Sequence, residues 1–240
     1  MKLNEFKKQL IQMQQIFAEL PSIVQKLQRL RSTIDAFENH QLPPLPLLSL
    51  ELSPDYILAH IQKYPQLMNL TSFLEDFRQL MITNFGIWHI FNQLWLNDLQ
   101  DFCGLTSHNL EVMAGNALIT SFLKNTVATD NLRWQGQDNE LPQPWTNVIQ
   151  LDALKAVKKY YSKVDNIIMA WAPDNSDIDY HLLQFLRKVH YQGNFIVIGE
   201  QNGVTDSKIF WQNAKLTLND QLNQHHHSFD FIKDKVWLVK

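Results

Sequence analysis

Residues 109–130 read NLEVMAGNALITSFLKNTVATD, and this stretch decides how the rest of the chain is organised. A short apolar run, Leu110–Met113, leads into the tight turn Ala114-Gly115-Asn116, and a brief helical segment follows. A second apolar run then ends at Asp130. Strand, turn, helix, strand and acid in this order predict the first βαβ unit of a nucleotide-binding sheet, in which backbone N–H groups and a helix N-terminus face the ligand.

Beyond Gly104, apolar runs recur with helical stretches between most of them. The runs are Leu110–Met113, Thr126–Thr129, Asn147–Leu151, Asn166–Trp171 and Asn194–Gly199. This alternation predicts a parallel sheet with right-handed crossovers. Two further strand-like runs, Ser228–Ile232 and Val236–Val239, are separated by three polar residues and predict an antiparallel hairpin at the sheet edge. The expected fold class is therefore α/β, with a Rossmann-like sheet of five parallel strands plus a C-terminal antiparallel hairpin.

The first 83 residues are predicted to form an all-helical N-terminal region, followed by the Rossmann-like domain over 84–240. Apolar residues recur in steps of three and four, which places them along one face of a helix. They are Leu3, Phe6, Leu10, Met13, Phe17, Leu20, Val24 and Leu27. Pro21 interrupts the run, which indicates a kink or a new helix with Pro21 in its first turn. The stripe packs either on its own chain or on a second copy, as a short coiled coil that forms a homodimer. The segment Gln41–Leu50 carries three prolines and is expected to be a linker that lies on the domain as a strap.

Composition narrows the class of protein further. The 240 residues carry a net charge of -3, which gives no reason to expect nucleic acid held by bulk electrostatics. No apolar run approaches the roughly 18 residues that a membrane span needs. The single cysteine, Cys103, excludes an internal disulfide, and the N-terminus lacks the apolar core of a signal peptide. We therefore expect a cytoplasmic protein without a membrane partner.

Four motifs in order resemble the class I S-adenosylmethionine-dependent methyltransferases, in particular a poorly characterised branch of that family. They are an E-x-G-A-G-x-G turn at Glu111–Ala117, a T-D acid at Thr129-Asp130, a tryptophan-proline signature at Trp171-Ala172-Pro173 and a G-E element at Gly199-Glu200. Phe85-Gly86-Ile87-Trp88 is similar to an aromatic segment that this branch places ahead of its first strand. The similarity covers about Asn84 to the C-terminus. It implies a methyltransferase with S-adenosyl-L-methionine as its cofactor.

The resemblance also implies roles for single residues. Gly115 lets the backbone approach the methionine part of the cofactor, Glu111 faces its amino group and Asp130 accepts the two ribose hydroxyls. Asp152 bonds the adenine amine in the family, although an aspartate before Ala153 also serves as a helix cap. The cofactor-binding set is Glu111, Met113, Ala114, Gly115, Asn116, Asp130 and Asp152, and the substrate-pocket set is Trp88, Trp171 and Pro173.

Two positions depart from the family's pattern, because Met113 and Ala117 stand where the first and third glycines are expected. The Met113 side chain must turn away from the pocket or occupy space that the cofactor would use. The alternative reading is therefore a non-catalytic Rossmann-like module with a helical association arm, in which cofactor binding is lost or weakened. Methyl transfer requires alignment and a dry pocket, so no catalytic residue is predicted. Ala-Pro-Asp at 172–174 differs from the Asn-Pro-Pro-aromatic box that grips base amines, so a small molecule or protein side chain is favoured as acceptor over nucleic acid.

A histidine tract, His225-His226-His227, has the composition of a metal ligand set. It lies in a Gln/Asn-rich segment, and no cysteine or suitably spaced carboxylate completes a site in the sequence. We expect these side chains to be solvated and predict no metal site.

Overall fold

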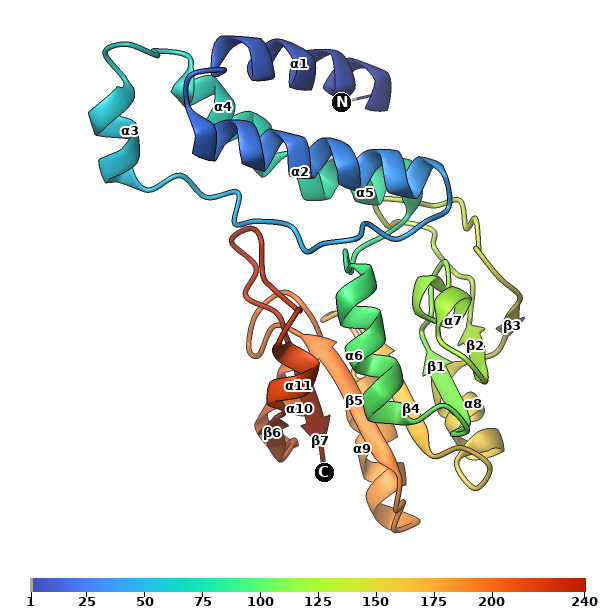
Figure 1. Ribbon diagram of the computed structural model, residues 1–240. Coiled ribbons are helices and arrows are strands. Elements are labelled where there is room, and N and C mark those ends of the chain that lie inside the picture. The colour runs from blue at the N-terminus through green and yellow to red at the C-terminus, as the bar shows by residue number, and fades with distance from the viewer. Residues whose placement is uncertain (1) are drawn as a thin grey trace.

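A computed structural model describes residues 2–240, and its centre is a seven-stranded sheet of order β3-β2-β1-β4-β5-β7-β6 (Figure 1). The strands are β1 (Asn109–Val112), β2 (Thr126–Asp130), β3 (Val148–Gln150), β4 (Asn166–Ala170), β5 (Asn194–Gly199), β6 (Leu216–Leu218) and β7 (Lys235–Val239). β1 to β5 pair in parallel, whereas β7 is antiparallel to both β5 and β6. The predicted α/β fold class, with a Rossmann-like sheet whose first five strands are parallel, is confirmed.

The predicted location of the first strand of the C-terminal hairpin, Ser228–Ile232, was wrong. β7 partners β6, which lies before the helix α11 (Asp220–Asn223), while Ser228–Ile232 has no regular structure. The reason lies in Asp230, whose Oδ1 accepts the backbone N–H of Ile232 at 3.1 Å and whose carboxylate also binds Arg78. A side chain that bonds its own backbone two residues on turns the chain, so the apolar pattern there cannot form a ladder.

The N-terminal region consists of helices, as predicted, and further helices flank the sheet. They are α1 (Leu3–Ile16), α2 (Pro21–Glu38), α3 (Pro54–His60), α4 (Leu67–Glu75), α5 (Phe77–Phe85), α6 (Gln93–Cys103), α7 (Leu118–Phe122), α8 (Ala153–Tyr160), α9 (Ile178–Lys188) and α10 (Lys208–Asn213), with α11 after β6. Pro21 starts α2 instead of kinking one long helix. Phe6, Leu10 and Leu27 are fully buried within this chain, and the homodimer through these helices stays a prediction.

Apolar side chains cover both faces of the sheet. Along β4 and β5, Ile167 and Val197 belong to a cluster with α8, α9 and α10, while Ile168 and Ile196 belong to a second cluster with α6 and the N-terminal helices. Strands buried on both faces are apolar at nearly every position, which is why they were visible as runs in the sequence. The second cluster extends without interruption from Phe6 in α1 to the sheet.

The proline-rich segment 41–50 is an extended strap that crosses between the helical layer and the sheet (Figure 1). Leu42, Leu47 and Leu50 are buried. The backbone N–H of Leu50 donates to the carbonyl of Phe229 at 2.6 Å, and the carbonyl of Pro43 accepts the N–H of Gln93 at 2.9 Å. The strap therefore joins the two layers, and the proposed domain division after residue 83, which falls inside α5, stays a prediction.

Three asparagines fix the register of the central strands at the end of the sheet where each strand begins. Asn109, Asn166 and Asn194 are register partners on β1, β4 and β5. The Asn166 side chain donates to Asn109 Oδ1 at 2.8 Å, and that of Asn194 donates to Asn166 Oδ1 at 2.7 Å. Since a slip of one residue would break this ladder, it aligns the opposite, carboxyl ends of β1 and β4.

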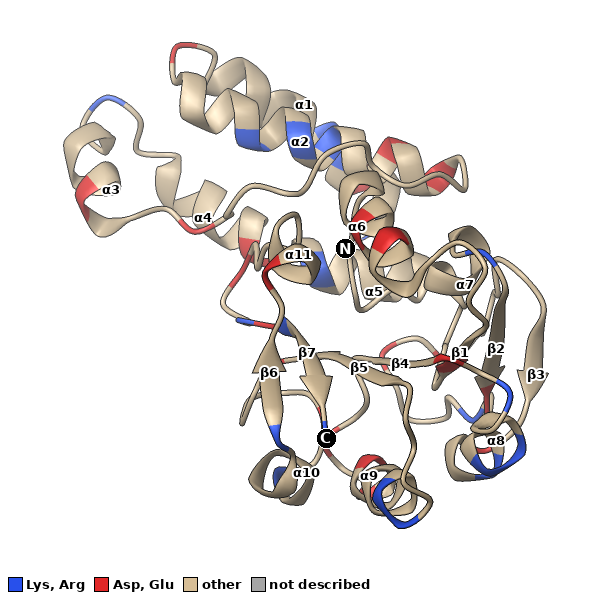
Figure 2. Cartoon of the chain, turned by 60° about the horizontal axis from the view of Figure 1, so that its bottom comes forward, with Lys and Arg blue, Asp and Glu red and all other residues tan. Residues whose placement is uncertain are grey.

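Acidic and basic residues both occur on the outer helices (Figure 2). The last turn of α8 carries Lys158 and Lys159, whereas α9 has Asp179 in its first turn and two basic residues in its last. Among the described residues, no helix combines the length and the apolar character that crossing a bilayer requires.

Candidate functional site

A cavity of about 640 Å³ lies at the carboxyl ends of β1, β2 and β4. Its volume is in the range of small-molecule and cofactor sites. The N-terminal region supplies part of the wall through Glu75, Arg78, Gln79 and Ile82. Nine of the predicted site residues line it: Trp88, Glu111, Met113, Ala114, Gly115, Asn116, Asp130, Trp171 and Pro173.

The turn after β1 has a glycine-like backbone although two of its three left-handed residues carry side chains. Met113, Gly115 and Ala117 have φ values of 52°, 54° and 55°, all in the left-handed region. Left-handed backbone costs a residue with a side chain roughly 1–2 kcal/mol. Met113 lines the cavity and also packs against the apolar cluster under the sheet, and the cavity is open with this side chain in place.

Asp130 at the end of β2 holds this turn with its carboxylate. Its Oδ2 accepts the backbone N–H of Gly115 at 2.9 Å, and its Oδ1 accepts that of Leu132 at 2.7 Å. The indole N–H of Trp134 lies 3.4 Å from the same Oδ1. Each carboxylate oxygen has two lone pairs, so Oδ2 retains acceptor capacity toward the cavity.

Glu111 on β1 is buried in the cavity wall. Both of its hydrogen bonds use one oxygen, Oε2, which accepts the N–H of Thr120 at 2.9 Å and the Thr120 hydroxyl at 2.5 Å. Burial raises the pKa of Glu111 to about 7, although these two bonds favour the charged form. The carboxyl group therefore titrates near neutral pH, and Oε1 carries neither bond.

Asn116 attaches the end of α5 to the turn. Its side-chain amide donates to the carbonyl of Phe85 at 2.8 Å, and its Oδ1 accepts the backbone N–H of Gln143 at 2.8 Å. Gly86 follows α5 with φ of 60°, and a Cβ there would lie 2.6 Å from the Asn116 amide nitrogen. Glycine is thus required at residue 86 for both backbone conformation and space. The helical region is fixed to the turn through this contact.

The sequence analysis missed Trp134, which lies in the segment between β2 and β3. Its side chain is 4% exposed and packs edge-to-face on Trp88, with ring centroids 5.6 Å apart. It also covers Gly115, where a Cβ would be 3.7 Å from the indole ring. The only sequence signal was a tryptophan four residues after the strand-end acid, in a segment without a helical pattern.

Arg78 organises the opposite wall of the cavity. Its guanidinium binds the buried carboxylate of Asp230 through two hydrogen bonds, of 2.5 and 3.0 Å. It also donates to the carbonyl of Trp88 at 2.7 Å and lies 4.3 Å from the ring centroids of both Trp171 and Phe229. One side chain of α5 thus joins the helical region, the end of β4 and the loop before β7.

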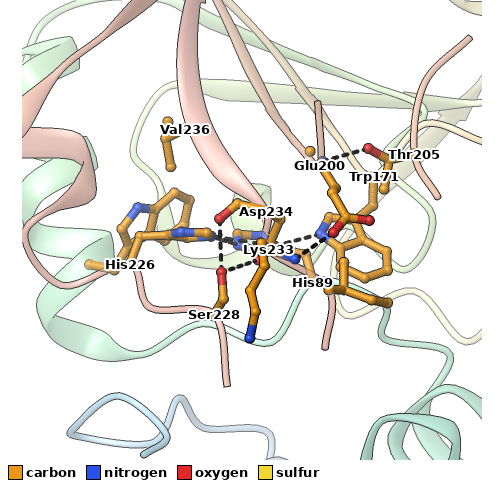
Figure 3. Close-up of polar contacts among 12 residues, drawn as sticks. His89, Trp171, Glu200, Thr205, His226, Ser228, Lys233, Asp234 and Val236 are labelled. Carbon is orange, nitrogen blue, oxygen red and sulfur yellow. Dashed lines mark hydrogen bonds and ion pairs between the residues drawn. The ribbon is translucent and has the colours of Figure 1, made fainter. Parts of the chain in front are cut away.

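The expectation that the histidine tract is solvated was wrong for His226. Its side chain is buried, and its Nε2 lies 3.1 Å from Nε2 of His89 and 3.6 Å from Oδ2 of Asp234 (Figure 3). Burial lowers the pKa of both imidazoles, that of His89 to about 3. The carboxylate that the sequence seemed to lack is Asp234, eight residues downstream. His89 was missed because it comes from the segment before α6, far away in the chain.

Asp152 lies outside the cavity lining. Its side chain caps α8 and accepts the N–H groups of Leu154 and Lys155 at 3.1 and 3.3 Å. This is the helix-cap alternative that the sequence had left open.

No protein-family model matches this chain, and no curated protein matches it. Among solved structures, a candidate O-methyltransferase from Nostoc punctiforme PCC 73102 is similar, with 14% sequence identity and a TM-score of 0.35. The match covers 93% of this chain and 71% of that chain.

Proposed function

We propose that this chain binds S-adenosyl-L-methionine in the strand-end cavity and transfers its methyl group to a small molecule or a protein side chain. The observation that carries the proposal is the position of the cavity. In the order β3-β2-β1-β4-β5, the direction of strand succession reverses between β1 and β4, and ligands of open α/β sheets bind outside the strand ends at this point. The cavity lies there, with Glu111, Gly115 and Asp130 in its wall.

The residues present fit this cofactor. Glu111 leaves Oε1 for an ammonium group, and Gly115 has no side chain between its backbone and the cavity. Asp130 Oδ2 retains an acceptor for a ribose hydroxyl. Trp134 offers an aromatic ring at the same wall, and stacking of a base on an aromatic side chain contributes about 1–3 kcal/mol.

Backbone strain around the cavity supports the same reading. Met113 and Trp171 line the cavity with left-handed backbone, and Ala117 and Leu132, which lie between lining residues, are left-handed as well. Such strain persists only where the surrounding structure determines it, and it is concentrated at ligand sites and active sites. Met113 and Ala117 carry side chains but have the backbone geometry that glycine usually provides, so the turn has the shape of a ligand-binding turn.

S-adenosylmethionine supplies a methyl group that is already electrophilic because it is bound to a sulfonium. The chain therefore has to orient the acceptor in line and exclude water. Trp88 and Trp171 line the cavity on the side of the helical region and can do both. Arg78 fixes the position of each, through the backbone carbonyl of Trp88 and the ring of Trp171.

A non-catalytic Rossmann-like module is the second candidate, favoured by one specific observation. The Asp130 carboxylate already accepts two backbone N–H groups, so it has a structural role that needs no ligand. The association arm in that reading receives less support, because the apolar stripe of α1 and α2 packs within the chain.

Isothermal titration calorimetry with S-adenosylmethionine and S-adenosylhomocysteine tests the proposal. We expect micromolar Kd values, and Asp130→Asn should weaken binding by about 10–100-fold, the contribution of a hydrogen bond to a charged group. Asp101→Asn, an exposed carboxylate on α6, is the matched control and should leave the Kd unchanged. Absence of heat at millimolar cofactor would support the non-catalytic module.

Because Asp130 also holds the turn, each variant is checked for folding by its circular dichroism spectrum and melting temperature. A second variant, Gly115→Val, places a branched side chain at the cavity wall without removing a polar group. Loss of binding in both variants with retained folding supports the assigned cavity. Unchanged binding in both would mean that any cofactor binds elsewhere.

A further inference from the structure

His89, His226 and Asp234 meet at one buried point between two distant parts of the chain. His89 lies between α5 and α6, and the other two residues belong to the loop that leads from α11 into β7. One ligand-type atom from each residue lies within 4.8 Å of the other two. Figure 3 shows the side chains of His89 and His226 pointing toward each other, with Asp234 beside them.

Hydrogen bonding within the chain leaves this group incompletely satisfied. One of the two facing Nε2 atoms can donate to the other, but Nδ1 of both His89 and His226 has no partner among residues 2–240. The distance of 3.6 Å from His226 Nε2 to Asp234 Oδ2 is too long for a hydrogen bond. The unpaired atoms are thus the two Nδ1 nitrogens, whereas the two Nε2 nitrogens and one carboxylate oxygen of Asp234 come together at one buried point.

Two of the three separations are close to those of ligands around one metal ion. Bonds of about 2.0–2.2 Å from a metal to nitrogen or oxygen place adjacent ligand atoms about 3.0 Å apart in an octahedron and about 3.4 Å apart in a tetrahedron. The two nitrogens are 3.1 Å apart, and the nitrogen-to-oxygen distance is 3.6 Å. The third separation, from His89 to Asp234, is within 4.8 Å, so binding of an ion draws these two side chains together.

We propose that His89 Nε2, His226 Nε2 and Asp234 Oδ2 bind a divalent first-row transition metal ion such as Zn²⁺ or Fe²⁺. Two imidazoles and one carboxylate favour these metals over Mg²⁺ and Ca²⁺, which prefer oxygen ligands. Three protein ligands leave at least one coordination position open. This proposal does not depend on methyl transfer.

The surroundings of Asp234 and the nearby charges are consistent with the site. Trp171 donates its indole N–H to Asp234 Oδ2 at 2.9 Å, and the Ser228 hydroxyl lies 3.3 Å from Oδ1. Such contacts orient a ligating carboxylate. The positive charge of Arg78 is balanced by Asp230 at 2.5 Å. Because His89 and Trp171 also line the large cavity, the ion lies in its wall and ties the segment before α6 to the loop before β7.

The test uses the full chain without an added histidine tag, stripped with a chelator and dialysed. Titration with Co²⁺ is followed by visible absorption, and titration with Zn²⁺ by calorimetry. We expect one equivalent to bind, with d–d bands for Co²⁺. At a free Zn²⁺ concentration of about 100 times the Kd, the melting temperature should rise by about 5 °C.

His226→Gln and Asp234→Asn should each weaken binding by at least about 10-fold, whereas His227→Gln should not. His227 is the matched control because it is exposed and lies in the same tract. Loss of binding in His227→Gln but not in His226→Gln would assign the metal to the surface tract and overturn the proposal. Failure of the wild-type chain to bind either ion would also overturn it.

If His226→Gln does not fold, His89→Gln provides the same test from the other segment of the chain. The wild-type melting shift needs no variant, and its absence at saturating Zn²⁺ would count against the site. Titration with S-adenosylmethionine in the stripped chain separates the two proposals, because cofactor binding and metal binding can each fail alone.

Discussion

The two walls of the large cavity are built in different ways. The strand-end wall comes from one continuous stretch, Glu111 to Asp130, and its contacts are mostly between side chains and nearby backbone N–H groups. The opposite wall joins Arg78, His89, Trp171 and the loop before β7, which are up to 152 residues apart in sequence. Most of its contacts connect side chains to side chains, and Arg78 also donates to the backbone carbonyl of Trp88.

The two walls are therefore expected to differ in how strongly a substitution affects the stability of the fold. A wall made of local turns can hold residues with side chains at left-handed positions, as Met113 and Ala117 show, because the backbone conformation is fixed by its neighbours. A wall made of distant side chains depends on each partner, since removing one leaves another buried and unpaired. We therefore expect substitutions in the opposite wall, called the assembled wall below, to lower the free energy of unfolding more than substitutions in the strand-end wall.

The largest effect is expected for Arg78→Met. The substitution keeps an apolar stem between Trp171 and Phe229 but leaves the Asp230 carboxylate buried without its partner. Breaking a buried ion pair in this way costs about 3–5 kcal/mol. The free energy of unfolding, measured by urea denaturation, should fall by this amount.

Arg31→Met is the matched control, because Arg31 pairs with Asp35 on the surface of α2 and both side chains are about half exposed. It should change the unfolding free energy by no more than about 0.5 kcal/mol. Equal losses for the two arginines would show that the assembled wall has no special dependence on Arg78. Asp230→Asn added to Arg78→Met should recover part of the loss.

A smaller effect, dependent on pH, is expected for Glu111→Gln in the strand-end wall. The pKa of Glu111 is about 7 in the folded chain against an ordinary 4.5, so the folded state holds the proton more tightly than the unfolded state does. Wild-type stability should therefore fall as pH rises from 4.5 to 7, relative to the variant, by roughly 2–3 kcal/mol.

Urea denaturation of both proteins at pH 5.0 and 7.5 measures this difference. A wild-type chain that gains stability relative to Glu111→Gln over that range would show that the carboxylate is stabilised in its charged form. The burial argument for the cavity wall would then be wrong.

The smallest effect is expected at Met113, and its sign is informative. Met113→Gly and Met113→Ala both remove the side chain beyond Cβ, so their difference reports mainly the backbone preference plus one methyl group. At φ of 52° the glycine variant should be more stable than the alanine variant by about 0.5–1 kcal/mol. In an ordinary strand or helix the order is reversed. Thermal and urea unfolding of the pair decide whether the left-handed turn is present.

The positions of the parallel strands along the chain could be predicted from the sequence, because most of them are apolar runs that end in a turn. The same signal failed at Ser228–Ile232, where the Asp230 side chain turns the backbone. The strand-and-helix pattern also gave no sign that Trp134 belongs to the cavity wall. A helix was expected between most strands, and the segment after β2 that carries Trp134 has none. Local pattern predicts an element only when no side chain, near or distant in sequence, competes for its backbone.

For this chain, the sequence by itself determined the Rossmann-like sheet, the helical N-terminal region and the residues of the strand-end turn. These follow from periodicity and turn chemistry within about 20 residues, which act before the chain is packed. Only the tertiary structure decided that Arg78 closes the cavity, that Asp152 caps a helix outside it, and that His89 meets His226 and Asp234. Contacts between side chains far apart in sequence leave no periodic trace, because each depends on how whole layers pack.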